Sequence, residues 1–288
     1  MPAPLLLTDA PGLLYRAFFA LPDSITAPDG RPVNALLGSI NQTLQVIEQR
    51  RPRAVVMCFG QESASYRVAA LPAYHAHRPP MPDALRDQWE MAPALYSALG
   101  WTVTAHDDLE ADDLLHAYSR AESAAGGRTL ILTADRDMFQ CATDDVRVLL
   151  QGGTAKGEPL EMGPEEVRER YGIDPAQVPD FIALRGDPSD GIPGAKGIGE
   201  KTAADLLRRH ETLEQALASA IRETPAVRRA LIDQADELRS FRDMATLRDV
   251  PVERPPDAPT DWLGGVSAVR ELGMNRLAAR LEQAAASS

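Results

Sequence analysis

Five short apolar runs in the first half of the chain constrain its fold more than any other feature. They carry little polar alternation and are separated by segments with helical periodicity. Strands of this kind are buried on both faces, as in a parallel sheet covered by helices. The pattern therefore predicts an α/β domain with a central, mostly parallel sheet flanked by helices. The expected strands are 4–9, 54–59, 101–106, 128–135 and 146–151, and the expected helices between them are 34–50, 82–99 and 110–124.

The second half of the chain has a different character. Helical patterns follow one another there, and no strong strand pattern recurs. We therefore expect an α/β core over residues 1–160 and a helical region over residues 161–288. The segment 60–82 fits neither pattern and is interpreted as a long functional loop. The expected helices of the second half are 164–171, 175–185, 199–210, 212–222 and 226–247.

The composition sets broad limits on the class of protein. The 288 residues are 44% hydrophobic, which is enough for a sizeable core. No run of 18 apolar residues is present, and the N-terminus lacks the basic and apolar regions of a signal peptide. The chain has only two cysteines, so a disulfide framework is not expected. These features predict a cytoplasmic location and no membrane partner.

The net charge of −12 argues at first sight against a nucleic-acid partner. Proteins that bind nucleic acid without sequence preference are usually basic, because their affinity comes from the release of phosphate counterions. Net charge describes the whole surface, however, and a local site can have the opposite sign. The acidic total therefore weakens the expectation of nucleic-acid binding without excluding it.

Eight carboxylates fall where the expected strands and helices would bring them together. In a parallel sheet, residues at the carboxyl ends of the strands lie along one edge. So many acids within a short distance would repel one another unless they were protonated or bound to cations. Oxygen ligands without His or Cys favour Mg²⁺ or Mn²⁺, and two such ions about 4 Å apart can clamp a phosphodiester and activate water. The candidate ligands are Asp9, Glu110, Asp112, Asp113, Asp135, Asp137, Asp187 and Asp190.

Each of these acids, taken singly, could instead stabilise the local backbone. An Asp at such a position can cap a helix, support a turn or be solvated. Asp107 and Asp108 precede the helix at 110–124 and are interpreted in that way. A phosphatase with an aspartyl nucleophile is disfavoured, because the first strand is followed by Asp9-Ala10-Pro11 and not by Asp-x-Asp.

The stretch "GIPGAKGIGEKTAADLLRRH" (191–210) is a second candidate site. Gly197 and Gly199 permit a tight turn, and a helix is expected to begin directly after it. The free N–H groups at that helix start, with Lys196, Lys201 and Thr202, could bind a backbone phosphate. The alternative is a glycine turn that joins two packed helices. No set of side chains suited to base recognition is apparent.

Several motifs resemble the bacterial 5′-nuclease (flap endonuclease) family, which includes the 5′→3′ exonuclease domain of DNA polymerase I. They cover roughly residues 4–250, and they imply a PIN-like 5′-nuclease fold with a helical arch within 60–99 and a helix–three-turn–helix at about 180–210. The resemblance also implies a freestanding nuclease. The motifs are "LLLTDAPGLLYRAFFA", "YHAHRPPMPDAL", "LEADDLL", "LTADRDMFQ" and "YGIDPAQVPDFIALRGDPSDGIPGAKGIGEKTAADLL".

The resemblance assigns further roles. The eight acids fall on the family's metal-binding positions. Arg67 and Arg78 fall on arch positions that hold the scissile phosphate, although a solvated arginine is the alternative. Tyr74 would stack near the terminal base, and a core or hinge tyrosine is equally consistent with its position. His75 stands where the family has a lysine that helps to position the phosphate.

Three positions depart from the family pattern. Gly60 replaces an Asp that is a metal ligand in the family, and Ala10 replaces the Gly of the first motif. His75 is charged for only part of the time near neutral pH, which weakens the cation. These departures put the catalytic rate in doubt more than the fold.

The sequence thus predicts a metal-dependent, structure-specific 5′-nuclease that hydrolyses phosphodiesters in flapped or nicked duplex DNA. The expected cofactors are two or more Mg²⁺ or Mn²⁺ ions, and K⁺ at the helix–three-turn–helix is a further expectation. The expected partners are DNA and a DNA polymerase or ligase, with the protein a monomer. The alternatives are a catalytically weakened DNA-junction binding protein of the same fold and a related ribonuclease.

Overall fold

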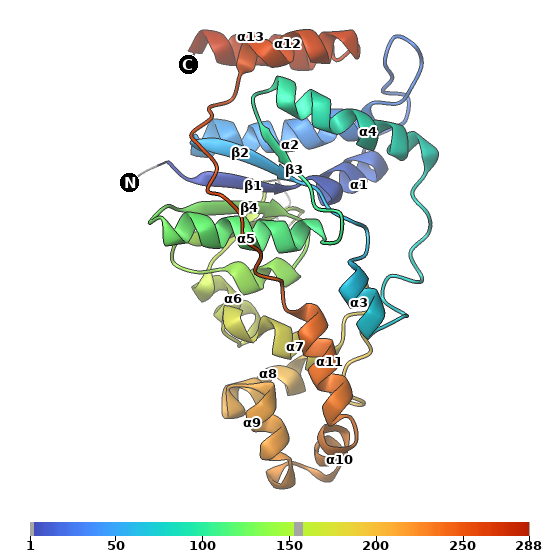
Figure 1. Ribbon diagram of the computed structural model, residues 1–288, viewed down its shortest axis with the longest axis vertical. Helices are drawn as coiled ribbons and strands as arrows, with labels where there is room; N and C mark the ends of the chain where they lie inside the picture. The colour runs from blue at the N-terminus through green and yellow to red at the C-terminus, as the bar shows by residue number, and fades with distance from the viewer. Residues whose placement is uncertain (1–2, 153–157, 288) are drawn as a thin grey trace.

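The computed structural model describes residues 3–152 and 158–287. The molecule is elongated, with a helix-covered sheet in its middle and a group of helices at one end (Figure 1). Within the described residues, no helix has both the length and the apolar character needed to cross a membrane.

The sheet has six strands in the order β3-β2-β1-β4-β5-β6. All neighbours pair in parallel except β5 and β6, which are antiparallel. The five expected strands are confirmed, whereas the three-residue β6 is too short to give a sequence pattern. The strands are β1 (Leu5–Asp9), β2 (Ala54–Cys58), β3 (Thr102–Thr104), β4 (Thr129–Thr133), β5 (Val146–Leu150) and β6 (Leu160–Met162).

Helices cover both faces of the sheet, as the apolar strands predicted (Figure 1). Every residue of β1 is buried. Leu5 and Leu7 point to the core layer that contains α5, whereas Leu6 points to the layer that contains α1, α2 and α4. The three expected helices are confirmed, and α1 was not expected. The bounds are α1 (Ala10–Ala20), α2 (Asn34–Arg50), α4 (Asp83–Ala98) and α5 (Ala111–Ala124).

The segment between β2 and α4 forms the arch expected from the sequence. It contains the short helix α3 (Ser65–Ala70), followed by turns over residues 72–77. In Figure 1 this segment leaves the side of the sheet, reaches towards the helical end and returns to α4.

The helical region lies below the sheet in Figure 1. The single helix expected at 226–247 is wrong, because the chain breaks at Gln234 into two helices. At the break, Gln234 has φ −112° and ψ 15°, and its Oε1 accepts a hydrogen bond from the backbone N–H of Lys196 at 2.7 Å. The α-helices are α6 (Pro164–Tyr171), α7 (Val178–Arg185), α8 (Glu200–His210), α9 (Leu213–Ala218), α10 (Pro225–Asp233) and α11 (Ala235–Ala245). Short 3₁₀ helices occupy Asp137–Cys141, Pro175–Gln177 and Ala220–Arg222.

The last two helices, α12 (Trp262–Glu271) and α13 (Asn275–Ser287), were not expected. They return to the opposite end of the molecule and pack beside α4 (Figure 1). Gly265 lies so close to Leu99 that a Cβ on it would be 2.3 Å from Leu99 Cδ2. The indole N–H of Trp101 donates to Thr260 Oγ1 at 3.1 Å. Part of the range 161–288 therefore belongs structurally to the α/β core.

The segment that connects α11 to α12 is fixed by a buried ion pair. Glu122, on α5, is 1% exposed and is clasped by Arg53 and Arg254. Arg53 also donates to the carbonyl oxygen of Pro255 at 2.8 Å. These contacts hold the connecting segment against α5 and against the residue that precedes β2.

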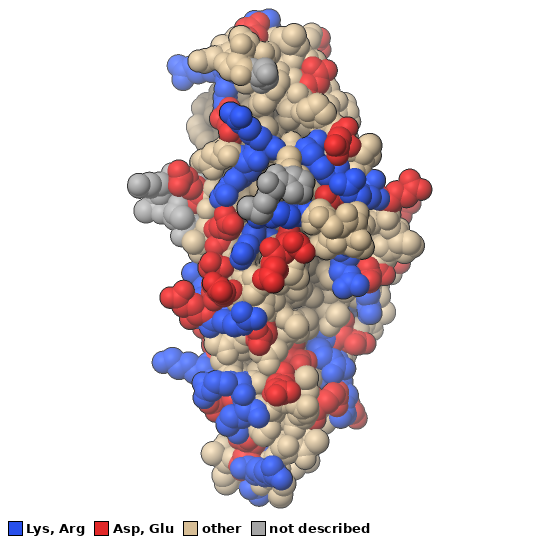
Figure 2. All heavy atoms as spheres, turned by 90° about the vertical axis from the view of Figure 1, so that its left-hand side faces the viewer, with Lys and Arg blue, Asp and Glu red and all other residues tan. Residues whose placement is uncertain are grey.

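On the face drawn in Figure 2, basic and acidic side chains are interspersed from the top to the bottom of the molecule. The atoms that this view displays form no continuous basic surface, which agrees with the negative net charge.

Candidate functional site

Asp9 is held rigidly at the carboxyl end of β1. It caps α1, because Oδ1 accepts the backbone N–H of Gly12 at 2.8 Å. Its Oδ2 accepts the hydroxyl of Thr133, at the end of β4, at 3.0 Å. Burial raises the pKa of Asp9 in spite of both hydrogen bonds. The two hydrogen bonds thus fix the position of the Asp9 carboxylate, and its burial makes the ionised form energetically unfavourable.

Asp135 and Asp137 follow β4 directly, as predicted. The backbone N–H of Asp137 donates to Asp135 Oδ1 at 2.8 Å, which fixes the turn. Burial and the charges of Asp190 and Asp9 raise the pKa of Asp135 to about 6. Burial and the charge of Asp135 raise the pKa of Asp137 well above its ordinary value.

Asp112 comes from the first turn of α5 and meets the same group. Burial raises its pKa well above the ordinary range, and the charges of Asp135, Asp9 and Glu110 add to the effect. We call Asp9, Asp112, Asp135 and Asp137 the acidic cluster. Within this group, from three segments of the chain, the charge of Asp9 raises the pKa of Asp112 and Asp135, and the charge of Asp135 raises the pKa of Asp112 and Asp137.

Asp187 and Asp190 reach the acidic cluster from the helical region. They belong to a tight loop in which Asp187 and Ile192 exchange two backbone hydrogen bonds of 2.8 Å. Gly186 (φ +80°) and Gly194 (φ +70°) close this loop, where a Cβ on Gly194 would lie 2.3 Å from the backbone nitrogen of Gly186. Both aspartates raise the pKa of Asp137 by their charge. The loop thus delivers negative charge to the cluster.

The donor set fits a hard divalent cation. It consists of carboxylate oxygens that raise one another's pKa, which is the situation that a bound cation relieves. Among the described side chains, however, no three carboxylates, imidazoles or thiols are already arranged as a metal-binding group. Metal binding would therefore have to draw the acids closer together.

Glu110 and Asp113 are occupied by partners from the arch. Arg67, which is 4% exposed, pairs with Glu110 at 2.9 Å and with Asp113 at 3.4 Å. Its Nε donates to the carbonyl oxygen of Met244, on α11, at 3.1 Å. Asp113 also accepts the backbone N–H of Arg248 at 2.8 Å. Arg67 thus joins the arch, α5 and α11, and a phosphate contact would require it to leave these partners.

Tyr74 is also turned inward. It is 5% exposed, and its hydroxyl donates to Glu110 Oε2 at 3.0 Å. Its ring stacks on that of His75 with the ring centroids 3.7 Å apart. The structure therefore places Tyr74 in the interior, where its ring packs on a neighbour and is not presented to a base.

His75 and Arg78 both contact Asp190. His75 Nε2 lies 3.1 Å from Asp190 Oδ1, and Nδ1 lies 2.8 Å from the carbonyl oxygen of Glu62. The Ser63 hydroxyl also lies 3.0 Å from Nδ1, so the imidazole ring has polar partners at both nitrogens. Arg78 pairs with the same oxygen at 3.0 Å but remains 48% exposed. Burial would raise the pKa of Asp190, but the hydrogen bond and charge of His75 and the charge of Arg78 outweigh it and lower this pKa.

Comparison with known families and structures identifies the family and the fold of the chain. Residues 4–172 match the model of the 5′-3′ exonuclease N-terminal resolvase-like domain, and residues 173–261 match that of the 5′-3′ exonuclease C-terminal SAM fold. The chain belongs to the 5′-3′ exonuclease family. A "5'-3' exonuclease" of Mycobacterium tuberculosis is 36% identical, with 99% of this chain and 98% of that protein covered. A "5'-3' exonuclease" of Streptomyces coelicolor is also 36% identical, with coverage of 88% and 89%.

Solved structures show the same fold. A structure of T5 5′-exonuclease described with bound divalent metal ions (zinc) has a TM-score of 0.68 and 15% identity, and the match covers 97% of this chain and 98% of that one. The catalytic core of Rad2 in complex with DNA substrate has a TM-score of 0.63 and 14% identity, with coverage of 97% and 90%. The fold expected from the sequence is confirmed.

Gly60 departs from the exonuclease pattern for a steric reason. A Cβ at this position would lie 2.5 Å from the backbone nitrogen of Ala111 and 2.5 Å from the carbonyl oxygen of Leu109. The next residue, Gln61, donates its N–H to that same carbonyl at 2.8 Å. The end of β2 therefore lies directly against the start of α5, and this backbone leaves no space for the missing carboxylate.

The glycine turn of the exonuclease lies open at the start of α8. Lys196, Gly197, Gly199 and Lys201 are exposed, and Thr202 is half-buried. Gly197 has φ +77°, and no atom lies within 4 Å of a Cβ built on either glycine. Neither lysine forms an ion pair within the described parts of the chain. The backbone and the two ammonium groups are thus accessible from solvent.

Sequence reasoning missed two residues beside the site. Tyr66 donates its hydroxyl to Asp113 Oδ1 at 3.2 Å. The guanidinium of Arg248 lies over the ring of Tyr66, 4.3 Å from its centroid. The two are 182 positions apart in the sequence, so no local pattern could have paired them.

Proposed function

We propose that this 5′-3′ exonuclease family member is a divalent-metal-dependent nuclease that hydrolyses phosphodiesters near the 5′ ends of flapped or nicked duplex DNA. The observation that carries the proposal is the acidic cluster at the carboxyl edge of the sheet, where burial raises the pKa of every member and the charges of Asp9 and Asp135 add to the effect on the others. Burial of such a group opposes folding, and perturbed carboxylates of this kind are typical of functional sites, here one at which cations and a phosphodiester would meet.

The acidic cluster would supply the first ligands, with Asp187 and Asp190 completing the set from the loop. Bound divalent cations would lower the pKa of water and stabilise the charge of the leaving oxygen. Glu110 and Asp113 are proposed to contribute as further acids next to this set, where Arg67 pairs with both of them.

Cations of the chain itself would hold the substrate. Arg78 is half exposed beside Asp190 and can contact the scissile phosphate, with His75 supporting it. Arg67 would position Glu110 and Asp113. Lys196 and Lys201, with Gly197, Gly199 and Thr202, would bind the backbone of the duplex, which is a contact without sequence preference.

Finer features of the proposal rest on the chemistry of the donors and on relatives. All-oxygen ligands support Mg²⁺ or Mn²⁺, two ions suit the number of acids, and K⁺ at the glycine turn belongs to the same proposal.

A "DNA polymerase I" of Mycobacterium bovis is 35% identical over 88% of this chain and 28% of that protein. This supports a DNA polymerase or ligase as a working partner. We further propose a cytoplasmic monomer.

A single assay tests the proposal against its alternatives. A flap with a DNA arm, the same flap with an RNA arm, and single-stranded DNA are incubated with Mg²⁺, Mn²⁺ or EDTA. We expect cleavage of the DNA flap with either ion and none in EDTA. Tight flap binding with no cleavage would establish a junction-binding protein, and preferential cleavage of the RNA arm would establish a ribonuclease.

A further inference from the structure

Arg185, the last residue of α7, lies between an aromatic ring and the loop that carries Asp187 and Asp190. Its guanidinium is over the ring of Phe181, 5.1 Å from the centroid. One terminal nitrogen donates to Asp187 Oδ2 at 3.3 Å, and the two side chains are 22% and 13% exposed. The cation is therefore largely withdrawn from water and directly contacts one of the candidate metal ligands.

Hydrogen bonds account for little of this placement of Arg185. Its Nε is buried and makes no hydrogen bond within residues 3–152 and 158–287. A buried donor without a partner opposes folding, and a contact of 3.3 Å is long for a charge-assisted hydrogen bond. The attraction of the surrounding acids is the remaining interaction that favours a positive charge at this position.

A small cavity brings Arg185 next to the acidic cluster as well. Arg185 lines it from α7, and Asp137 lines it from the start of the 3₁₀ helix that follows β4. The volume is about 20 Å³, which is enough for about one water molecule. Burial and the neighbouring carboxylates raise the pKa of Asp137, whereas the charge of Arg185 lowers it. The guanidinium thus acts on two acids, one in the loop and one in the cluster.

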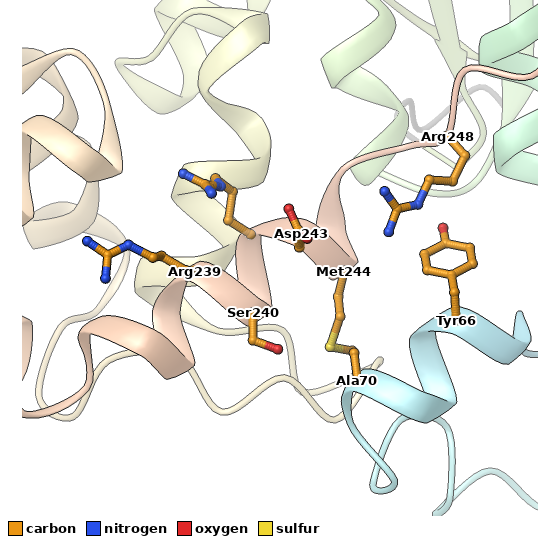
Figure 3. A pocket seen from close by; sticks show the side chains of 8 residues that line it. Tyr66, Ala70, Arg239, Ser240, Asp243, Met244 and Arg248 are labelled. Carbon is orange, nitrogen blue, oxygen red and sulfur yellow. The ribbon is translucent and has the colours of Figure 1, made fainter.

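Other arginines of the helical region have different partners. The helix α11 packs against α7, and its Arg239 pairs with Glu214 at 3.0 Å. The guanidinium of Arg248, beyond the end of α11, lies over the ring of Tyr66 on α3 (Figure 3). Of these three side chains, Arg185 is the one that pairs with a candidate metal ligand.

We propose that Arg185 is an internal counterion that pairs with Asp187 in the metal-free protein and competes with divalent cations for it, so that this residue sets how much metal the nuclease needs. The inference rests on the proposed function and adds a positioning residue to its metal site. A cation that binds Asp187 must displace the guanidinium or lie beside it, and like charges repel. Because the Arg185 side chain is 22% exposed, it has access to solvent when it is displaced.

The test measures the binding of Mg²⁺ to the full chain without DNA, by calorimetric titration at pH 8. Arg185→Gln removes the charge and keeps a side chain that can donate to Asp187. We expect this variant to bind Mg²⁺ about tenfold more tightly than wild type, the scale on which residues beside metal ligands change metal affinity. In EDTA its midpoint of urea unfolding should be lower than that of wild type, and this deficit should shrink as Mg²⁺ is added.

Further variants separate charge from packing. Arg185→Met, whose thioether can pack on Phe181, is a second neutral variant with the same expected gain in affinity. Arg185→Lys keeps the positive charge and should bind Mg²⁺ with nearly the wild-type affinity. In an Asp187→Asn background, Arg185→Gln should lose most of its effect, because the carboxylate for which arginine and metal compete is absent.

Arg170→Gln is the matched control for the loss of an arginine. Arg170 is exposed on α6 and also lies over an aromatic ring, 5.7 Å from the centroid of Tyr171. Its replacement removes the same charge and the same kind of ring contact, and it should leave the affinity for Mg²⁺ unchanged.

The outcomes distinguish the counterion from the nuclease function. Weaker Mg²⁺ binding by the two neutral variants would overturn the proposal, because it would show that the arginine holds Asp187 in place for the metal. Flap cleavage by wild type, combined with equal Mg²⁺ affinities of wild type and the neutral variants, would overturn the counterion and leave the nuclease standing. Tighter Mg²⁺ binding by the neutral variants of a protein that cleaves no flap would support the counterion and reject the nuclease.

Discussion

Replacement of Asp135 by Asn should stabilise the metal-free protein while weakening metal binding. Burial and the charges of Asp190 and Asp9 raise the pKa of Asp135 to about 6, from an ordinary value of 3.8. The ionised side chain therefore opposes folding at neutral pH. Asn removes the charge and keeps an oxygen that can accept the N–H of Asp137, which donates at 2.8 Å in the wild type.

The magnitude follows from the shift of about 2 pKa units. At about 1.4 kcal/mol per unit, the free energy of unfolding of Asp135→Asn should exceed that of wild type by about 3 kcal/mol at pH 8. Because the folded-state pKa is raised, this difference is fully present above about pH 6 and declines as the pH falls. It should be about half as large at pH 5, which is close to the isoelectric point of about 4.9.

Urea unfolding in EDTA at pH 8 and pH 5, followed by titration with Mg²⁺, measures both effects. Wild type should gain stability as the ion binds, by about 2.7 kcal/mol at a hundredfold excess over Kd, and Asp135→Asn should gain much less. Asp107→Asn is the control, because Asp107 is exposed and its replacement should change stability by less than about 0.5 kcal/mol. If Asp135→Asn is no more stable than wild type in EDTA at pH 8, the acidic cluster does not carry the charge repulsion argued above.

Three further substitutions test other parts of the site. Asp137→Asn should reduce Mg²⁺-dependent cleavage by at least about 100-fold in a single-turnover assay, while flap binding in EDTA persists; cleavage at the wild-type rate would remove Asp137 from the metal site. Lys201→Ala should weaken binding to all duplex sequences alike and lower the salt slope by about one unit, whereas a loss confined to certain sequences would show base recognition. Gly60→Asp should destabilise the fold by roughly 2–4 kcal/mol in urea unfolding and should not lower the Mg²⁺ requirement, because its Cβ would meet backbone atoms at 2.5 Å. A stably folded Gly60→Asp that needs less Mg²⁺ would show instead that the site lacks a ligand in the wild type.

The central sheet could be predicted from sequence because its signal is local. Runs such as 128–135 are apolar without alternation, and parallel strands end along one edge, so the acids that follow them must be neighbours. The structure brings Asp9, Asp112 and Asp135 together in this way: burial raises the pKa of all three, and the charge of Asp9 adds to the effect on the other two.

Other features depend on partners that are distant in sequence. Arg67 is held by the carbonyl of Met244, and Tyr74 by Glu110, so their burial has no local signature. The steric role of Gly60 arises from the backbone of another segment and could not be separated from a lost ligand. At the break between α10 and α11, Gln234 likewise bonds to a residue distant in sequence, Lys196.

The return of α12 and α13 to the far end of the molecule affects how the protein can be made. Leu99, Trp101 and Tyr96 are covered in part by residues beyond 259, which leave the ribosome after the strands and helices of the core. During synthesis the apolar face of the α/β core around Leu99 and Trp101 therefore stays uncovered until the intervening helices and then α12 and α13 have emerged. A chaperone that shields such a surface would have its main opportunity in that interval.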